Sequence, residues 1–269
     1  MLVHPKIDPV LFALPEIELF GFHFQFAVHW YGLMYLLGFL GFWWFGTRRA
    51  AQPHIQWSRE WVSDLLFYGV VGVIIGGRLG YMLFYNLPGF LGEPLSALRI
   101  WEGGMSFHGG LIGVLVAMWW FGRVHKLNFF DVGDFAVPMI PLGLLTGRIG
   151  NFINGELWGA PTTLPWGMVF PAAGPEPRHP SMLYEAFLEG AVLFAILWWF
   201  ARKPRPRMAV GGLFLLGYGL FRTLVETVRL PDAHIGYLAG TGWLTMGMVL
   251  SAPMWLAGAA MLLLAYRRR

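Results

Sequence analysis

The chain has 269 residues, of which 57% are hydrophobic and only 13% are charged, whereas soluble proteins carry about 25% charged residues. This composition excludes an ordinary soluble domain and indicates an integral membrane protein. The chain contains no cysteine, which excludes disulfides and thiolate catalysis by the chain itself. The net charge of +4 does not indicate nucleic-acid binding, because the basic residues cluster in particular loops.

Seven stretches are apolar and long enough to cross a bilayer as helices, which takes about 20 residues. Acidic residues and prolines interrupt the first twenty residues, so we expect no cleaved signal peptide. Because backbone polar groups cannot stay unpaired in lipid, each span should be helical. We therefore predict an all-α fold in which residues 1–269 form a single polytopic membrane domain, with spans at about 24–47, 61–86, 105–122, 131–150, 182–201, 209–228 and 243–266.

The basic residues orient these spans. If the N-terminus lies outside, the inner segments carry 12 Lys and Arg residues and the outer segments carry 4. The positive-inside rule then favours an outer N-terminus and a cytoplasmic C-terminus. The inner residues are Arg48, Arg49, Arg59, Arg123, Lys126, Arg202, Lys203, Arg205, Arg207, Arg267, Arg268 and Arg269, and the outer ones are Lys6, Arg99, Arg178 and Arg229.

Two of the predicted outer loops, 87–104 and 151–181, are long and rich in Gly and Pro. Loops of this length are usually either functional or disordered. Trp158 and Trp166 in the second loop are typical of a membrane interface. We therefore expect structured loops on the outer face and a working site toward the outer leaflet.

Polar side chains in or near the spans mark candidate sites, because ionisable groups in a bilayer are costly and usually functional. Tyr31, near the start of the first span, fits an aromatic interface anchor better than a functional residue when its own segment alone is considered. His108 lies near the outer end of the third span, among glycines that leave room around its ring. It can transfer a proton near neutral pH, although a histidine satisfied within the core gives the same pattern.

The most polar stretch ends the fourth span and runs from Gly147 to Gly159. Arg148 and Asn151 are three residues apart, so a continuing helix places them on one face. A guanidinium beside the amides of Asn151 and Asn154 is a suitable cradle for a phosphate or a carboxylate. The alternative is an arginine that extends from a helix end to the interface. With Glu156 and several glycines close by, the pattern favours a functional site.

Four polar residues of the sixth span share one helical face, because they are separated by 4, 4 and 3 residues. They are Tyr218, Arg222, Glu226 and Arg229. An Arg222–Glu226 ion pair would neutralise two buried charges, yet such a pair contributes little net stability, which favours a functional role.

Other patterns are less specific. The sequence Gly-Arg-x-Gly occurs at 77–80 and 147–150, through an old duplication or by chance. Before and within the fifth span, His179–Pro180–Ser181 and Tyr184–Glu185 fit a helix start in which Ser181 is a cap. No H-E-x-x-H, G-x-S-x-G or GxxxxGK[ST] motif is present, so a zinc protease, a serine hydrolase and an ATPase are poorly supported.

In combination, these segments resemble prolipoprotein diacylglyceryl transferase of bacteria, in order over residues 27–230. The Gly147–Gly159 stretch resembles the family signature. The other matching segments are Trp30–Tyr31–Gly32, Gly77–Arg78, His108–Gly109–Gly110, His179–Pro180–Ser181, Tyr184–Glu185 and Tyr218 through Arg229.

The resemblance implies transfer of the diacylglyceryl group of phosphatidylglycerol to the lipobox cysteine thiol of a prolipoprotein. The implied products are a thioether and glycerol 1-phosphate, and neither a metal nor another cofactor is used. The expected setting is the bacterial inner membrane. By carry-over, the catalytic residues are His108, Arg148 and Arg222, and the substrate-binding or supporting residues are Tyr31, Asn151, Asn154, Glu156, Gly159, Tyr218 and Glu226.

Our hypothesis for the mechanism makes His108 the base for the thiol and assigns the phosphate to Arg148 and Arg222. The field of the arginines is an alternative to a protein base. A lipid or anion transporter also fits the span number and the buried charges. A purely structural membrane scaffold is a third possibility.

Overall fold

The computed structural model describes residues 2–15, 17–19, 22–24, 27–100, 103–231 and 236–267. Arg268 and Arg269, two of the predicted inner basic residues, lie outside this range. The contacts divide the chain into two compact units. Unit 1 comprises Met1–Phe42 and Ala136–Arg269, and unit 2 comprises Trp43–Phe135. The expectation of a single domain stays a prediction.

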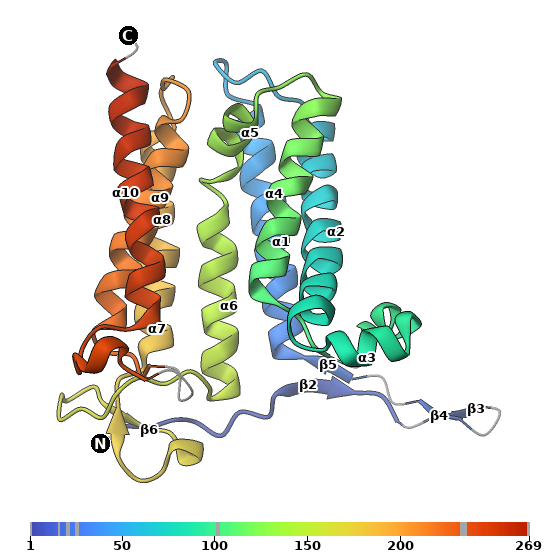
Figure 1. Cartoon of the computed structure of the whole chain (residues 1–269), viewed down its shortest axis with the longest axis vertical. Helices are drawn as coiled ribbons and strands as arrows, with labels where there is room; N and C mark the ends of the chain where they lie inside the picture. The colour runs from blue at the N-terminus through green and yellow to red at the C-terminus, as the bar shows by residue number, and fades with distance from the viewer. Residues whose placement is uncertain are drawn as a thin grey trace. The chain divides into compact units, whose positions relative to one another are not determined.

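The main helices follow the predicted spans, with the fourth span divided between α5 and α6 (Figure 1). They are α1 (Trp30–Ala50), α2 (Arg59–Phe84), α4 (Phe107–Val124), α5 (Phe129–Ala136), α6 (Ile140–Asn154), α9 (Ala209–Glu226) and α10 (Met246–Arg267). The fifth span is a continuous run of α7 (Ser181–Glu185), the π-helix η4 (Ala186–Val192) and α8 (Leu193–Phe200). Shorter elements are α3 (Leu87–Gly92), η1 (Pro94–Leu98), η3 (Pro171–Ala173) and η5 (Leu238–Gly240).

Within the described ranges, five helical stretches are long and apolar enough to cross a membrane: α2, α4, residues 181–200, α9 and α10. A sixth is counted if α5 and α6 form one span, although the two are bent by 52° at a break that contains Pro138. At 21 residues, α1 is long enough, but its Trp, Tyr and Gly residues make it less apolar. The helical membrane fold is confirmed, whereas the number seven and the orientation stay predictions.

Short strands depart from the all-α prediction. In unit 1, β1 (Leu2–Val3) pairs in parallel with β6 (Met168–Val169), which pairs antiparallel with β7 (Pro177–Arg178). Two antiparallel pairs precede α1: β2 (Val10–Ala13) with β5 (Ala27–His29), and β3 (Ile17–Leu19) with β4 (Phe22–Phe24). The first helix therefore begins at Trp30 and not near residue 24, because residues 27–29 are paired as a strand.

Glycines bring α2 and α4 together in unit 2. A Cβ on Gly76 would clash with the backbone of Gly109 and Gly113, and a Cβ on Gly80 would lie 2.7 Å from Gly109 Cα. Small residues at four-residue spacing let membrane helices approach at backbone distance. The first turn of α4 is therefore fixed against the last turns of α2. At the other end of unit 2, Trp57 stacks on Phe135 with a centroid distance of 3.7 Å.

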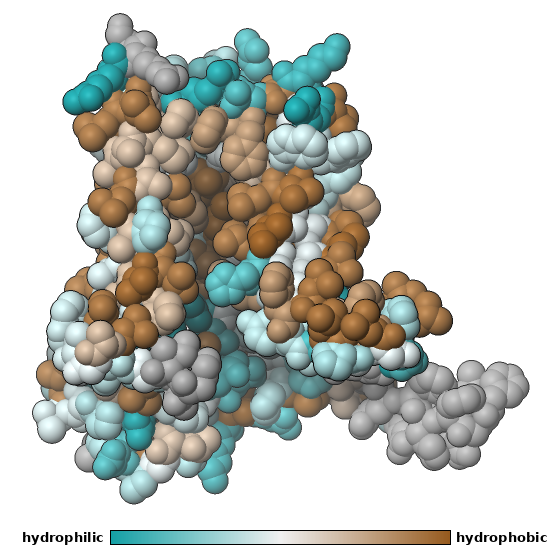
Figure 2. All heavy atoms as spheres, viewed as in Figure 1, coloured by the Kyte–Doolittle hydropathy of each residue, from teal (hydrophilic) through white to brown (hydrophobic). Residues whose placement is uncertain are grey.

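The core of unit 1 lies between α8, α9 and the break before α6. Its buried members are Val137, Leu193, Leu197, Ala201 and Val210. Glycines also allow the close packing of α9 on α10, since a Cβ on Gly219 would lie 2.9 Å from Trp255 N. Figure 2 shows apolar residues over α10, whose exposed Leu250, Leu256 and Leu263 are typical of a lipid-facing surface.

Candidate functional site

The centre of the site in unit 1 is the carboxylate of Glu185, at the end of α7. Its side chain is 0% exposed and contacts three arginines. Arg148 Nε lies 2.5 Å from Glu185 Oε2, while Arg222 Nη1 and Arg229 Nη1 both lie 2.6 Å from Oε1. Residues from α6, α7 and the end of α9, which lie side by side in unit 1 (Figure 1), thus meet at one buried anion.

A second carboxylate completes this cluster. Glu226 Oε1 lies 2.6 Å from Arg222 Nη2 and 3.3 Å from Arg229 Nε. Its other oxygen accepts a hydrogen bond of 2.6 Å from Thr245 Oγ1, just before α10. The predicted Arg222–Glu226 pair is therefore present, and it belongs to a larger network. We call Arg148, Arg222, Arg229, Glu185 and Glu226 the arginine cluster.

The end of α6 supplies the amides expected beside Arg148. Arg148 Nη1 donates to Asn151 Oδ1 at 3.4 Å, and the amides of Asn151 and Asn154 donate to Glu156 Oε1 at 2.9 and 3.2 Å. The helix ends at Gly155, whose φ of 66° is left-handed and turns the chain so that Glu156 lies back over the amides. The predicted grouping of these four side chains is thus present.

Gly159 is a packing position next to the arginine cluster. Its N–H donates to His179 O at 2.8 Å, and it forms an isolated β-bridge with Arg229. A Cβ there would lie 2.9 Å from His179 Cβ and still closer to Val228 O. The segment after α6 therefore lies directly against the backbone that carries Arg229.

The two predicted tyrosines lie on different sides of this region. The Tyr31 ring packs on Gly150 in α6, where a Cβ would lie 2.9 Å from Cδ2, and its hydroxyl lies 3.4 Å from that of Tyr35. Tyr218 precedes Arg222 by one turn of α9 and packs against the core of unit 1, where it stacks on Phe214. Tyr218 is thus one turn from Arg222 of the arginine cluster, and Tyr31 packs on the residue that precedes Asn151.

His108 belongs to unit 2 and not to the unit that contains the arginines. It lies exposed in the first turn of α4, with its ring edge-on to Phe107 at 5.7 Å. Ser106 caps the helix at its N-terminus, and its hydroxyl accepts a hydrogen bond of 3.2 Å from the Gly109 N–H. The role of His108 as a base stays a prediction.

Glu185 is the residue whose role the sequence patterns missed. The sequence reading gave it only as part of a helix start, although a carboxyl group in an apolar span is itself a functional signal. Two features of the structure mark the position of Glu185. Gly190 has no room for a Cβ against Leu145 of α6, so α6 and η4 lie in close contact. The π-helix that follows Glu185 is a feature frequent at functional sites.

The charges of the arginine cluster suit one monoanionic ligand. The five members of the arginine cluster sum to one positive charge, and the buried carboxyl group of Glu189 also interacts electrostatically with the three arginines. The side chains of Arg148 and Arg222 are 21% and 16% exposed, so an anion can reach them. Nη2 of Arg148 donates to no other residue in the described part of the chain. A phosphodiester has the required single charge and accepts forked hydrogen bonds from arginine.

Outside the spans, His179 Nδ1 lies 3.2 Å from the Tyr184 hydroxyl, which also accepts from Trp166 Nε1 at 2.8 Å. Desolvation by burial lowers the pKa of His179 below its usual value. The described residues include no group of three or more His, Asp or Glu side chains placed to hold a metal ion.

Comparisons with known proteins agree with this geometry. The family model for prolipoprotein diacylglyceryl transferase matches residues 18–264. A phosphatidylglycerol–prolipoprotein diacylglyceryl transferase of Methylococcus capsulatus is 58% identical over 272 residues, which cover 100% of this chain and 99% of the relative. The proteins of the same name from Coxiella burnetii and Pseudomonas paraeruginosa are 56% and 55% identical, again over 100% of this chain and over 99% and 97% of theirs. With its membrane helices and its buried arginine cluster, the chain belongs to the prolipoprotein diacylglyceryl transferase family.

Proposed function

We propose that this chain transfers the diacylglyceryl group of phosphatidylglycerol to the cysteine thiol of a prolipoprotein lipobox. The thiol sulfur forms a bond to the glyceryl carbon of the lipid, and the carbon–oxygen bond to the phosphate breaks. The products are a thioether-linked lipoprotein precursor and glycerol 1-phosphate. The observation that carries the proposal is the pair of partly exposed arginines, Arg148 and Arg222, in a chain that matches the family over nearly its whole length.

Arg148 and Arg222 bind the phosphate and stabilise the charge that develops as it leaves. This charge grows in the transition state, so donors held in advance stabilise the transition state more than the bound lipid. Glu185 and Glu226 hold the guanidinium planes in place. Asn151 and Asn154 bind polar atoms of the substrate with Glu156, while Tyr31, Tyr218 and Gly159 support these residues from behind.

His108 accepts the thiol proton and later releases it to water, while glycerol 1-phosphate leaves with the electron pair of the broken carbon–oxygen bond. A free thiol has a pKa of about 8.5 and is mostly protonated at neutral pH, so a base speeds its attack. What supports this role is the family motif around His108 and its exposed position in the first turn of α4. Replacement of His108 by Gln should therefore lower turnover, whereas near-wild-type turnover with an unshifted pH profile contradicts the role.

We further propose that the chain crosses the bacterial inner membrane seven times, with α1 as the first span, the N-terminus outside and the C-terminus in the cytoplasm. The bias of basic residues toward the predicted inner segments supports this orientation. In it, the arginine cluster faces the outer leaflet, from which phosphatidylglycerol enters laterally between helices.

The test uses purified protein, phosphatidylglycerol and a synthetic lipobox peptide, followed by mass spectrometry of the peptide. We expect a diacylglyceryl mass increment that requires the peptide cysteine and is lost in Arg148→Ala. An Arg148→Ala protein of native thermal stability would assign the loss to the site. Absence of the increment with folded wild-type protein would overturn the proposal and favour a lipid transporter, which forms no covalent bond.

A further inference from the structure

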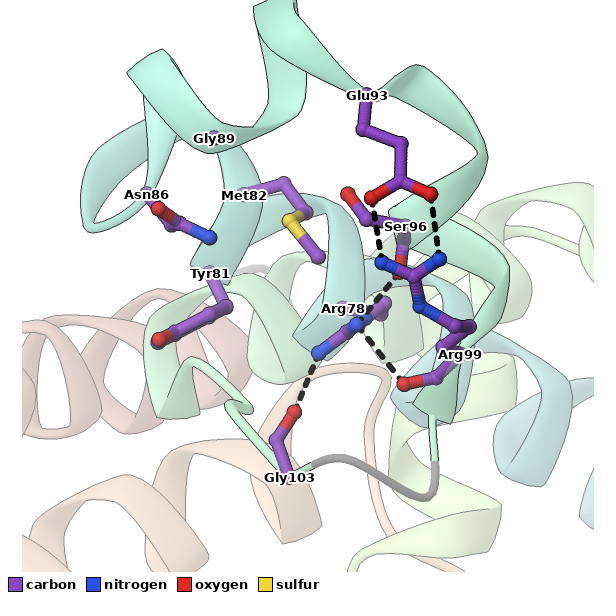
Figure 3. A pocket seen from close by; sticks show the side chains of 9 residues that line it. All are labelled: Arg78, Tyr81, Met82, Asn86, Gly89, Glu93, Ser96, Arg99 and Gly103. Atoms are coloured by element: carbon purple, nitrogen blue, oxygen red, sulfur yellow. Dashed lines mark hydrogen bonds and ion pairs between the residues drawn. The ribbon is translucent and has the colours of Figure 1, made fainter.

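Arg78 has a different environment from the arginines of unit 1. Arg78 lies in the C-terminal half of α2 and is only 4% exposed. It lines a pocket of about 220 Å³ (Figure 3). Among the described residues, its guanidinium donates hydrogen bonds to backbone carbonyls and lies 5.9 Å from the centroid of the Tyr81 ring. Nε donates to Ala97 O at 3.2 Å, Nη2 donates to Ser96 O at 2.6 Å and to Arg99 O at 2.9 Å, and Nη1 donates to Gly103 O and to Gly104 O.

These contacts leave Arg78 no donor for a ligand. A guanidinium has five N–H groups, and the five bonds use all of them. The neighbouring Arg99 side chain is bound at 2.6 and 2.8 Å to the Glu93 carboxylate, also on the pocket wall. Although Arg78 occupies the same motif position as Arg148, its geometry fits a structural cation that binds the backbone of the loop after α2.

The loop that Arg78 binds leads directly to His108. Its carbonyl partners lie at both ends of the segment 96–104, and the chain then continues into the first turn of α4. The adjacent Gly77 O accepts the Ser106 N–H at 2.9 Å, two residues before His108. Gly104, with a φ of 76°, lies so close to the Tyr81 ring that a Cβ would clash. One turn of α2 thus contacts the described residues on both sides of the segment that leads into α4.

We propose that Arg78 is a positioning residue for His108. It fixes the start of α4, and with it the imidazole, by binding the carbonyls of the preceding loop. The glycine contacts of α2 with α4 fix the helix axis, whereas Arg78 fixes the segment from which the first turn begins. This inference rests on the proposed role of His108 in proton transfer.

The test compares Arg78→Lys, Arg78→Gln and the control Glu93→Gln. Lysine keeps the charge but offers three N–H groups on one nitrogen, which cannot span five carbonyls. Glu93 lines the same pocket, but its side chain is 60% exposed and, among the described residues, pairs with the Arg99 side chain. Hydrogen exchange of residues 96–106 and separate kcat and KM values for phosphatidylglycerol are measured for each protein.

We expect faster exchange in the loop and a kcat lowered about 10- to 100-fold in both Arg78 variants, because small displacements of a catalytic group have effects of this size. KM for phosphatidylglycerol should stay within about twofold of wild type, because the arginine cluster is untouched. Glu93→Gln should match the wild type in all three measurements. Wild-type kcat in Arg78→Gln, or unchanged exchange in both variants, overturns the inference.

A double-mutant cycle separates this inference from the role of His108 itself. If Arg78 acts through His108, then Arg78→Gln causes little further loss of kcat in a His108→Gln background. Losses that multiply overturn the positioning role and leave His108 as the base. If His108→Gln alone retains wild-type kcat, the proposed base and the positioning role fail together, which no result on Arg78 alone would produce.

Discussion

Replacement of Glu185 by Gln tests the organisation of the arginine cluster. The glutamine has nearly the same shape but removes the negative charge that Arg148, Arg222 and Arg229 share. The excess positive charge of the cluster would rise from one to two. An anionic lipid would then be attracted at least as strongly, while the guanidinium groups would repel one another and lose their orientation.

The two effects separate in the kinetics. Removal of one partner from a buried ion-pair network costs about 3–5 kcal/mol, and the low end applies here because the arginines are partly exposed. Loss of one well-placed donor to a developing anion lowers kcat about 100-fold or more. We therefore expect a lower thermal midpoint, a kcat reduced about 100-fold, and a KM for phosphatidylglycerol that does not rise.

The assay is the transfer of diacylglyceryl to a lipobox peptide at varied phosphatidylglycerol concentrations, with thermal unfolding in detergent. The matched control is Glu189→Gln, one turn further along the same helix. Glu189 is also 0% exposed, but neither of its carboxyl oxygens has a hydrogen-bond partner among the described residues. The control should keep near-wild-type kcat. A raised KM with unchanged kcat in Glu185→Gln would refute the reasoning. It would mean that Glu185 stabilises the bound lipid and the transition state equally.

Three further changes have distinct expected outcomes. Glu226→Gln also adds one positive charge to the arginine cluster. Glycerol 1-phosphate should then inhibit turnover about tenfold more strongly, which is a difference of about 1.4 kcal/mol in binding free energy. An unchanged inhibition constant contradicts the charge argument. Gly159→Ala should lower the thermal midpoint and turnover, because its Cβ would clash with Val228 O, whereas Gly147→Ala, whose Cβ meets nothing within 4 Å, should not. Because burial lowers the pKa of His179, the folded chain resists protonation and should lose stability as the pH falls below about 6.5, where the unfolded residue binds its proton. Thermal midpoints at several pH values should show a smaller dependence in His179→Gln.

Local patterns predicted most of the helices. The stretches 61–86 and 209–228 correspond to α2 and α9 within about two residues at each end, because about 20 apolar residues suffice to specify a span. Helical spacing also predicted the grouping of Arg148 with Asn151 and of Arg222 with Glu226. In each case, the contact partners are at most four residues apart, so helical spacing alone predicts that their side chains are neighbours.

The relations that the sequence did not reveal are distant along the chain. Glu185 is 37 residues from Arg222 and 44 from Arg229, and only the packing of α6, α7 and α9 brings them together. The pairing of β1 with β6 joins residues 2–3 to residues 168–169, and two-residue strands have no periodicity to detect. The two carboxyl groups of the fifth span, Glu185 and Glu189, were a usable signal, but their different partners follow from tertiary contacts alone.

The two Gly-Arg-x-Gly sequences show why a buried arginine in a span does not by itself identify a binding site. Arg78 donates all five N–H groups to backbone carbonyls of a neighbouring loop and so holds that loop in place. Arg148 is paired with a carboxylate and an amide, and it keeps part of its surface exposed. A group that must release a product cannot have all its donors fixed by the protein, whereas a group that must hold a loop requires this. The partial exposure of Arg148, and its Nη2 group that has no partner among the described residues, therefore distinguish the site that we propose for phosphate from the structural arginine at position 78.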